Sequence, residues 1–416
     1  MIQTKFENDL YRSSDIERRT PQGFRIESHA RDDFERDYGR VVHSAAFRRL
    51  QSKTQVIGIG QGDFHRTRLT HSIEVSQIAR GIVLSLNEKS EILNQIDSKI
   101  DSSLIEAAAL AHDFGHPPFG HQGERALNEK MTEFGGFEGN AQTFRILTRL
   151  ERGRGLNLTR ATMLAILKYP IVYNDAVDIK SYSEGDYKPP KASIYKEDYD
   201  LFQWLIEPFT DDEKQFYMKT EKKIEGKHLK TKHKTLECSI IELADDIAYS
   251  THDLEDALKL KLIEIDDVND ILEKAYFNNK NQIIKKFNNA KRENFSDWVK
   301  DATADLISIF ISNVKIEERV DFESPRIRYG AYLPGELVDL IEKLKNLIKK
   351  KVIGLHRVQT IEWKGGQIIR QMFDAFYSNI NLLPEAERSS ITEENKARVV
   401  CDYIAGMTDS YALRMY

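Results

Sequence analysis

The stretch AHDFGHPPFGH, residues 111–121, places three histidines and an aspartate directly after an apolar run. That run, residues 104–111, is rich in alanine and leucine and has neither glycine nor proline, so it predicts a helix. Neighbouring helical residues point about 100° apart, so His112 and Asp113 can share one ion only if it lies between their directions. A His-Asp pair at a helix end, completed by ligands from other helices, is typical of a metal site, but a lone pair is more often a capping aspartate beside a chance histidine.

Composition narrows the class of protein. The 416 residues suffice for one large domain or two ordinary ones. A net charge of -5 gives no general reason to expect nucleic acid or membrane as the main partner. Cys238 and Cys401 lie far apart and suggest no disulfide framework. The N-terminal residues lack the apolar segment of a secretory signal, and no run of eighteen apolar residues occurs. We therefore expect a cytoplasmic protein.

Helical periodicity dominates the chain. Apolar residues recur at helical spacing over residues 75–84 and 239–258, and residues 337–348 form an amphipathic stripe with lysines opposite. We therefore expect one all-α domain over residues 1–416, with a core over about residues 35–260 and a helical C-terminal extension over about 261–416.

Few segments depart from this helical pattern. The best candidate for a strand is residues 326–332. Two polar stretches, residues 172–193 and 219–234, are predicted to be loops. The lysines of 219–234 could attract a triphosphate or bind single-stranded DNA weakly. The alternative is an ordinary solvated loop.

Further metal ligands must come from other helices. His71 begins a predicted helix, where a plain surface or core histidine is the alternative. Asp245 and Asp246 interrupt an apolar run, and a carboxylate on a buried helix face is costly unless it is paired or binds metal. A solvated helix edge remains the alternative for both. Two histidines and two aspartates would suit Mn²⁺, Mg²⁺, Fe²⁺ or Zn²⁺ better than a thiolate-binding ion.

Seven motifs in order give a stronger signal than the His-Asp pair alone. They are FRRLQSKTQV (47–56), TRLTHSIEV (67–75), HDFGHPPFGH (112–121), FEGNAQ (137–142) leading to Arg145, LKYP (167–170), ADDIAY (244–249) and DYIAGMTD (402–409). Together they resemble the HD-domain superfamily and, within it, the deoxyguanosinetriphosphate triphosphohydrolases (dGTPases). The resemblance runs nearly end to end and implies an HD-type helical bundle.

The resemblance also implies a ligand set. His71, His112, Asp113 and Asp245 would bind the metal. In the family the liganding aspartate precedes a sugar-contacting tyrosine by four residues and a second aspartate by eight, and from Asp245 these offsets reach Tyr249 and Asp253. A spacing of four or eight residues keeps side chains near one helix face, which favours Asp245 over its neighbour.

The histidine-rich stretch also carries the implied catalytic pair. Pro117 disfavours helical geometry at His116, so the first helix should end about Gly115 and a new one begin near His121. His121 and Glu124 then lie three residues apart on its first turn. In the resembled enzymes this pair acts at the α-phosphate, with the glutamate orienting the imidazole or the attacking water. Without the resemblance, plain helix-start residues would explain them equally well.

Substrate contacts follow from the same resemblance. Arg68 lies three residues before His71, so a shared helix face would place a guanidinium beside the metal and the phosphates. Lys168 matches a family lysine near the phosphates, and His116 would support or contact them. Gln55 matches a glutamine that hydrogen-bonds the 3′-hydroxyl together with the aspartate of the sugar pocket, Asp253, while the pocket tyrosine leaves little room for a 2′-hydroxyl.

These assignments predict a metal-dependent enzyme that hydrolyses dGTP, with other dNTPs as further substrates, to a deoxynucleoside and inorganic triphosphate. Mn²⁺ or Mg²⁺ is the expected ion, although Fe²⁺, Zn²⁺ or Ni²⁺ could occupy the isolated protein. The resemblance implies a homo-oligomer, with a hexamer favoured over a tetramer. The alternatives are an HD-domain 5′-nucleotidase or phosphodiesterase, and a regulator that binds nucleotide or single-stranded DNA without turnover.

Overall fold

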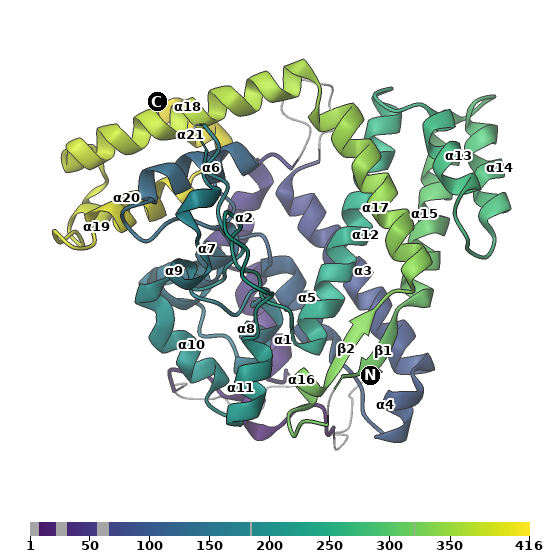
Figure 1. The fold of residues 1–416 in the computed structure, drawn as a ribbon, viewed down its shortest axis with the longest axis horizontal. Helices are drawn as coiled ribbons and strands as arrows, with labels where there is room; N and C mark the ends of the chain where they lie inside the picture. Colours follow the sequence, from purple (N-terminus) through teal and green to yellow (C-terminus); the bar gives the residue numbers. More distant parts are fainter. Residues whose placement is uncertain (1–7, 22–30, 56–65, 184, 320) are drawn as a thin grey trace.

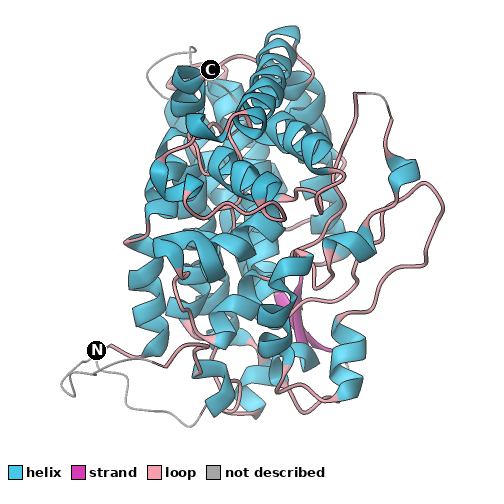
Figure 2. Cartoon of the chain, turned by 90° about the vertical axis from the view of Figure 1, so that its left-hand side faces the viewer, coloured by secondary structure: helices cyan, strands magenta, loops and turns pink. Residues whose placement is uncertain are grey.

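Helices build almost all of the structure, which is a computed structural model that describes residues 8–21, 31–55, 66–183, 185–319 and 321–416. Figure 2 shows helices throughout the molecule and one small sheet among them. In that sheet β1 pairs antiparallel with β2, and Lys315 faces Tyr332. The predicted all-α class is confirmed.

Helices of 4 to 24 residues follow one another along the chain. The helices of the N-terminal part are α1 (Asp33–Val42), α2 (Ala45–Arg49), α3 (Arg68–Lys89), α4 (Glu91–Gln95), α5 (Ser102–Ala111), α6 (Gly120–Met131), α7 (Gly139–Arg145), α8 (Arg160–Ile166), α9 (Tyr173–Ala176), α10 (Tyr199–Ile206), α11 (Asp211–Tyr217) and α12 (Leu236–Lys259). The elements that follow are α13 (Ile265–Glu273), α14 (Lys280–Ala290), α15 (Phe295–Asn313), β1 (Lys315–Glu318), α16 (Pro325–Arg328), β2 (Tyr329–Tyr332), α17 (Gly335–Ile348), α18 (His356–Ser378), α19 (Glu385–Arg388), α20 (Lys396–Ala405) and α21 (Asp409–Met415). Short 3₁₀ and π turns join several of them.

Helices α3, α5 and α12 form the centre of the molecule. The Asp101 carboxylate caps α5 by accepting a hydrogen bond from the Leu104 amide at 2.9 Å. Residues 104–111 of α5 are almost completely buried, and their small alanines let α3 and α8 pack closely against them. Helix α12 lies against both α3 and α5. His112 and Asp113 therefore directly follow α5, a helix that is packed against α3, α8 and α12.

A separate apolar cluster forms where the long helix α18 crosses α6, with α20 packed against both (Figure 1). Residues of these helices share one core, including Leu127, Phe373 and Ile404. The histidine-rich stretch thus connects α5, in the centre of the molecule, to α6. Helix α6 packs against α18 and α20 from the C-terminal part of the chain.

Two predicted boundaries were wrong. Helix α5 ends at Ala111 rather than about Gly115, because residues 112–115 form a turn against α7. The Gly115 amide donates to Thr143 Oγ1 at 2.9 Å, and an added Cβ at Gly115 would lie 2.0 Å from the Gly139 carbonyl oxygen.

Only the second half of the predicted strand 326–332 is extended. Pro325 starts a helical turn instead, and it buries Arg326 against Glu237.

The two predicted loops are largely irregular. Among its described residues, the stretch 172–193 has only α9, a 3₁₀ turn and isolated bridges, and 219–234 forms a loop with one isolated bridge between Thr220 and Thr231. Cys238 and Cys401 are buried and unpaired. Among the described residues, no helix combines the length and the apolar character that crossing a membrane requires. The division near residue 260 stays a prediction.

Candidate metal centre and adjoining cavity

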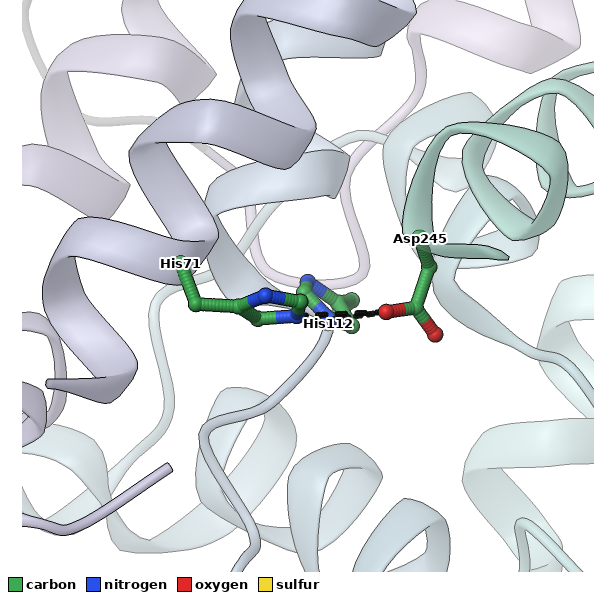
Figure 3. A group of neighbouring side chains, drawn as sticks. All are labelled: His71, His112 and Asp245. Carbon is green, nitrogen blue, oxygen red and sulfur yellow. Dashed lines mark hydrogen bonds and ion pairs between the residues drawn. The ribbon is translucent and has the colours of Figure 1, made fainter. Parts of the chain in front are cut away.

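Three predicted ligands converge from three central elements. His71 lies in the first turn of α3, His112 directly follows α5, and Asp245 lies in the middle of α12. Their candidate ligand atoms all lie within 4.8 Å of one another. His71 Nε2 is 3.1 Å and His112 Nε2 is 3.9 Å from Asp245 Oδ1. Figure 3 shows the two imidazoles and the carboxylate pointing toward one another.

The imidazole of His112 is oriented for metal binding. Its Nδ1–H donates to the Ala109 carbonyl oxygen at 2.6 Å, which leaves the lone pair of Nε2 facing the group. That Nε2 and the Nδ1 of His71 are buried, and neither has a hydrogen-bond partner among the residues that the structure describes. Buried polar atoms normally find partners, so an orphaned nitrogen beside a carboxylate fits a divalent ion with N and O ligands. His71, His112 and Asp245 are therefore the residues that would hold it.

Asp113, the fourth expected ligand, lies at the edge of this group. Its Oδ1 is 3.4 Å from His112 Nε2 and 3.1 Å from His116 Nδ1, while Oδ2 accepts a hydrogen bond from Arg68 Nη1 at 2.7 Å. Burial alone would raise the pKa of Asp113, but the charges of His116, His112 and Arg68 lower it well below its ordinary value. The carboxylate is therefore ionised, as a ligand must be.

The two neighbouring aspartates of α12 have different surroundings. Asp246 accepts a hydrogen bond from Lys345 Nζ of α17 at 2.9 Å and does not belong to the candidate metal group. Burial raises the pKa of Asp246, whereas contacts with His71 and His112 outweigh burial at Asp245 and lower its pKa. The geometry separates the two residues as the helical spacing predicted.

A cavity of about 1020 Å³ opens beside the candidate metal group. It is lined by every predicted site residue except one: Gln55, Arg68, His71, His112, Asp113, His116, His121, Glu124, Lys168, Asp245 and Tyr249. The exception is Asp253, which is buried in α12 and does not line this cavity. The volume matches that of a pocket for a small-molecule ligand.

His121 and Glu124 face each other at the start of α6. His121 Nδ1 lies 3.5 Å from Glu124 Oε2, and Glu124 Oε1 accepts a hydrogen bond from the Gly139 amide at 3.0 Å. The His121 side chain is 69% exposed, so it can reach a ligand, while Glu124 is buried behind it. Burial alone would raise the pKa of Glu124, but Lys191 and the hydrogen bond with His121 lower it below its ordinary value. An ionised glutamate therefore orients an accessible imidazole.

Sequence reasoning missed several polar residues of the cavity. Lys191, which lies in the stretch predicted as a plain loop, is 3.4 Å from Glu138 Oε1, and its neighbours Glu124 and Glu138 raise its pKa against the effect of burial. Arg125, Asn140, Tyr169, Lys188, Lys349 and Arg357 also line the cavity. Their spacing follows no helical or strand period, so only the fold brings them together.

Lys168 and Asp253 differ in their electrostatic surroundings. Lys168 Nζ lies 3.5 Å from Glu242 Oε1, and its pKa is raised despite burial. Burial, with help from Asp256 and Glu74, raises the pKa of Asp253 to about 8 against the opposing charge of Arg66. Within the described part of the chain, its Oδ2 has no hydrogen-bond partner, and neither has the buried Oε1 of Gln55 in the cavity wall.

Comparison with known proteins shows what this chain resembles. The profile of the HD domain matches residues 68–250, and that of the phosphohydrolase-associated domain matches residues 331–416. The chain is 41% identical to deoxyguanosinetriphosphate triphosphohydrolase-like protein 2 of Deinococcus radiodurans, over 96% of this chain and 94% of that protein. It is 42% identical to the deoxyguanosinetriphosphate triphosphohydrolase-like protein of Shewanella halifaxensis, over 93% and 91%. The chain belongs to the HD-domain dGTPase-like family.

Membership confirms the resemblance predicted from the seven motifs. The dGTPase-like chain is a metal-dependent phosphohydrolase, and the group of His71, His112 and Asp245 is its candidate divalent metal site. The roles of individual residues, the identity of the ion, the oligomeric state, the cytoplasmic location and the binding of single-stranded DNA stay predictions.

Proposed function

We propose that this chain is a dNTP triphosphohydrolase that prefers dGTP and releases a deoxynucleoside and inorganic triphosphate. The observation that carries the proposal is one cavity that holds the candidate metal group, the His121–Glu124 pair and two lysines, Lys168 and Lys191. The names of the relatives in Deinococcus and Shewanella are consistent with such an activity. A simple phosphomonoesterase would have no need for so many cations.

Cations of the cavity wall would hold the triphosphate. Lys168 and Lys191 stay protonated, since the pKa of each is raised. Arg68 uses Nη1 for Asp113, while no described residue accepts a hydrogen bond from its buried Nε. A guanidinium offers five donors in a planar fork, so Arg68 can hold Asp113 and a phosphate oxygen at the same time.

In the proposed reaction, water attacks the α-phosphorus and the bond from this phosphorus to the 5′ oxygen breaks. A divalent ion bound by His71, His112 and Asp245 would supply Lewis-acid chemistry at the α-phosphate. His121 donates a proton to the departing 5′ oxygen, so the deoxynucleoside leaves with a neutral hydroxyl group. The attacking water releases its proton to solvent, and His121 regains a proton from solvent. Glu124 keeps the imidazole oriented toward the departing oxygen.

The sugar would lie against Tyr249. This tyrosine lines the cavity one helical turn after Asp245, so a 2′-hydroxyl would collide with its ring. Gln55 Oε1, which has no partner among the described residues, would accept a hydrogen bond from the 3′-hydroxyl. Asp253 is two turns from Asp245 and would assist from behind the cavity wall.

A product assay tests the proposal. The purified chain is incubated with each of the four dNTPs and with Mn²⁺ or Mg²⁺, and the products are separated by anion exchange. We expect inorganic triphosphate in equal amount to deoxynucleoside, and fastest release from dGTP. Orthophosphate instead would indicate the 5′-nucleotidase or phosphodiesterase alternative, and binding without any product would indicate a regulator.

Isotope labelling locates the bond that breaks. In water enriched in ¹⁸O, attack at the α-phosphorus places the label in inorganic triphosphate and leaves the 5′-hydroxyl unlabelled. Label in the deoxynucleoside would contradict the proposed attack, because it requires cleavage between carbon and oxygen.

A further inference from the structure

Asp409 joins two segments of the cavity wall that are distant in sequence. It is the first residue of α21 and only 4% exposed. Its Oδ2 accepts a hydrogen bond from the Thr54 amide at 2.9 Å, and its Oδ1 accepts one from the Phe119 amide at 3.1 Å. Both carboxylate oxygens are therefore used, each by a backbone group of a different segment.

Each of these segments carries a predicted site residue. Thr54 directly precedes Gln55, and an isolated bridge pairs it with Thr67, the residue that caps α3 ahead of His71. Phe119 directly precedes α6, which carries His121 and Glu124 in its first turns. One carboxylate thus sets the distance between the Gln55 segment and the acid–base helix.

The start of α6 needs such a restraint. Phe119 has φ of 61° and Gly120 has φ of 57°, so two successive residues are left-handed, a conformation that is strained for a bulky residue such as phenylalanine. Helix α18 approaches this point closely through Gly365, where an added Cβ would lie 2.5 Å from Phe119 Cβ. Asp409 fixes the amide of the strained residue while α18 covers its side chain.

Lys53 provides a second connection between the same parts. Its buried Nζ donates to the carbonyl oxygens of His116 at 2.6 Å and of Ala405 at 3.0 Å. In addition, Asp402 of α20 accepts hydrogen bonds from Gln142 Nε2 and Arg145 Nε of α7. The motif of residues 402–409 therefore contacts the segments 53–54, 116–119 and 142–145.

We propose that Asp409 is a positioning residue that aligns the His121–Glu124 pair with the sugar-side segment at Gln55. This inference rests on the proposed function, because it assumes that His121 and Gln55 act on one substrate. Asp409 acts through the backbone amides of Thr54 and Phe119 and contributes no proton or metal ligand. A small misplacement of reacting groups is sufficient to lower a rate strongly, even when binding persists.

The decisive variant is Asp409→Asn. Asparagine has one carbonyl oxygen, so it can accept from only one of the two amides, and its NH₂ group opposes the other. We expect kcat to fall about 10²-fold with little change in KM and unchanged Mn²⁺ affinity. Hydrogen exchange measured by mass spectrometry should speed up in the peptides that contain Thr54 and Phe119.

Thr408→Ala is the matched control. It removes the side-chain cap of the same helix, where Oγ1 accepts from the Tyr411 amide at 3.2 Å, and leaves the Asp409 carboxylate intact. This variant should retain the wild-type kcat. Asp409→Glu keeps both acceptor oxygens and should recover part of the activity lost in Asp409→Asn. If Asp409→Asn does not fold, Asp409→Glu is measured in its place. We then expect a reduced kcat and an unchanged Mn²⁺ affinity for Asp409→Glu.

Two results would overturn the inference: a wild-type kcat in Asp409→Asn, or an equal loss in Thr408→Ala, which would assign the effect to the stability of α21. Failure of the proposed function is a separate outcome, because then the wild-type chain itself releases no inorganic triphosphate. The hydrogen-exchange comparison would still test the two amide contacts in that case.

Discussion

Replacing Glu124 by glutamine isolates the charge of the acid–base pair. Glu124 is 4% exposed, and glutamine has nearly the same shape, so its carbonyl oxygen can still accept from the Gly139 amide. What the variant loses is the negative charge 3.5 Å from His121 Nδ1. His121 would then be less well oriented toward the leaving group, while the residues proposed to hold metal and triphosphate stay in place.

The size of the effect follows from this contact. A hydrogen bond to a charged group contributes about 1.5–3 kcal/mol, and about 1.36 kcal/mol corresponds to a tenfold change in rate. We therefore expect Glu124→Gln to lower kcat roughly 10- to 150-fold, with KM for dGTP nearly unchanged. Release of inorganic triphosphate over a range of dGTP concentrations gives both constants, and calorimetric titration with Mn²⁺ shows whether the metal group is intact.

The same helix offers a matched control. Glu129 of α6 contacts Arg370 Nε at 2.6 Å and does not line the cavity, so Glu129→Gln makes the same chemical change without touching His121. It should keep wild-type kinetics. A rise in KM with unchanged kcat in Glu124→Gln would refute the reasoning, since Glu124 would then serve binding alone.

Other predictions test the metal group, a buried acid and the sugar pocket. Asp245→Ala should abolish turnover and Mn²⁺ binding measured by calorimetry, whereas Asp246→Ala should keep its metal; the reverse result would mean that the ligand is Asp246. Because Asp253 has a pKa of about 8 in the folded chain against about 3.9 unfolded, its protonated form favours folding, and that stability is lost as pH rises from about 4 to 8. Asp253→Asn should therefore raise Tm more at pH 8.5 than at pH 5 in thermal melts, and an equal shift at both pH values would contradict the raised pKa. Tyr249→Ala should increase kcat/KM for GTP relative to dGTP, and an unchanged ratio would show that the ring does not exclude ribose.

Periodic features of the sequence predicted much of the fold. The alanine-rich run before His112 and the stripes of α12 and α17 have the apolar spacing of buried helices, and the structure has helices there. The four-residue spacing of Asp245 and Tyr249 also predicted that both face one side of α12, and both line the cavity. Such inferences succeed because helical geometry is local.

Long-range contacts could not be predicted in this way. Lys191 enters the cavity from an irregular loop, and Arg357 enters it from a helix more than a hundred residues after Asp245. The turn that ends α5 early depends on close contact between Gly115 and α7, which no property of residues 112–115 reveals. Asp253 has the spacing of a cavity residue, yet packing places it outside the lining.

The contacts of Asp409 also set an order of events during synthesis of the chain. Its carboxylate bonds to residues 355 and 290 positions earlier, whereas the candidate metal group is complete once Asp245 has been made. Translation adds about 5–20 residues per second, so the 164 residues from Asp245 to Asp409 take roughly 8 to 33 s. His71, His112 and Asp245 are therefore all present in the growing chain before Asp409, so α6 receives its last restraint after the candidate metal ligands have been made.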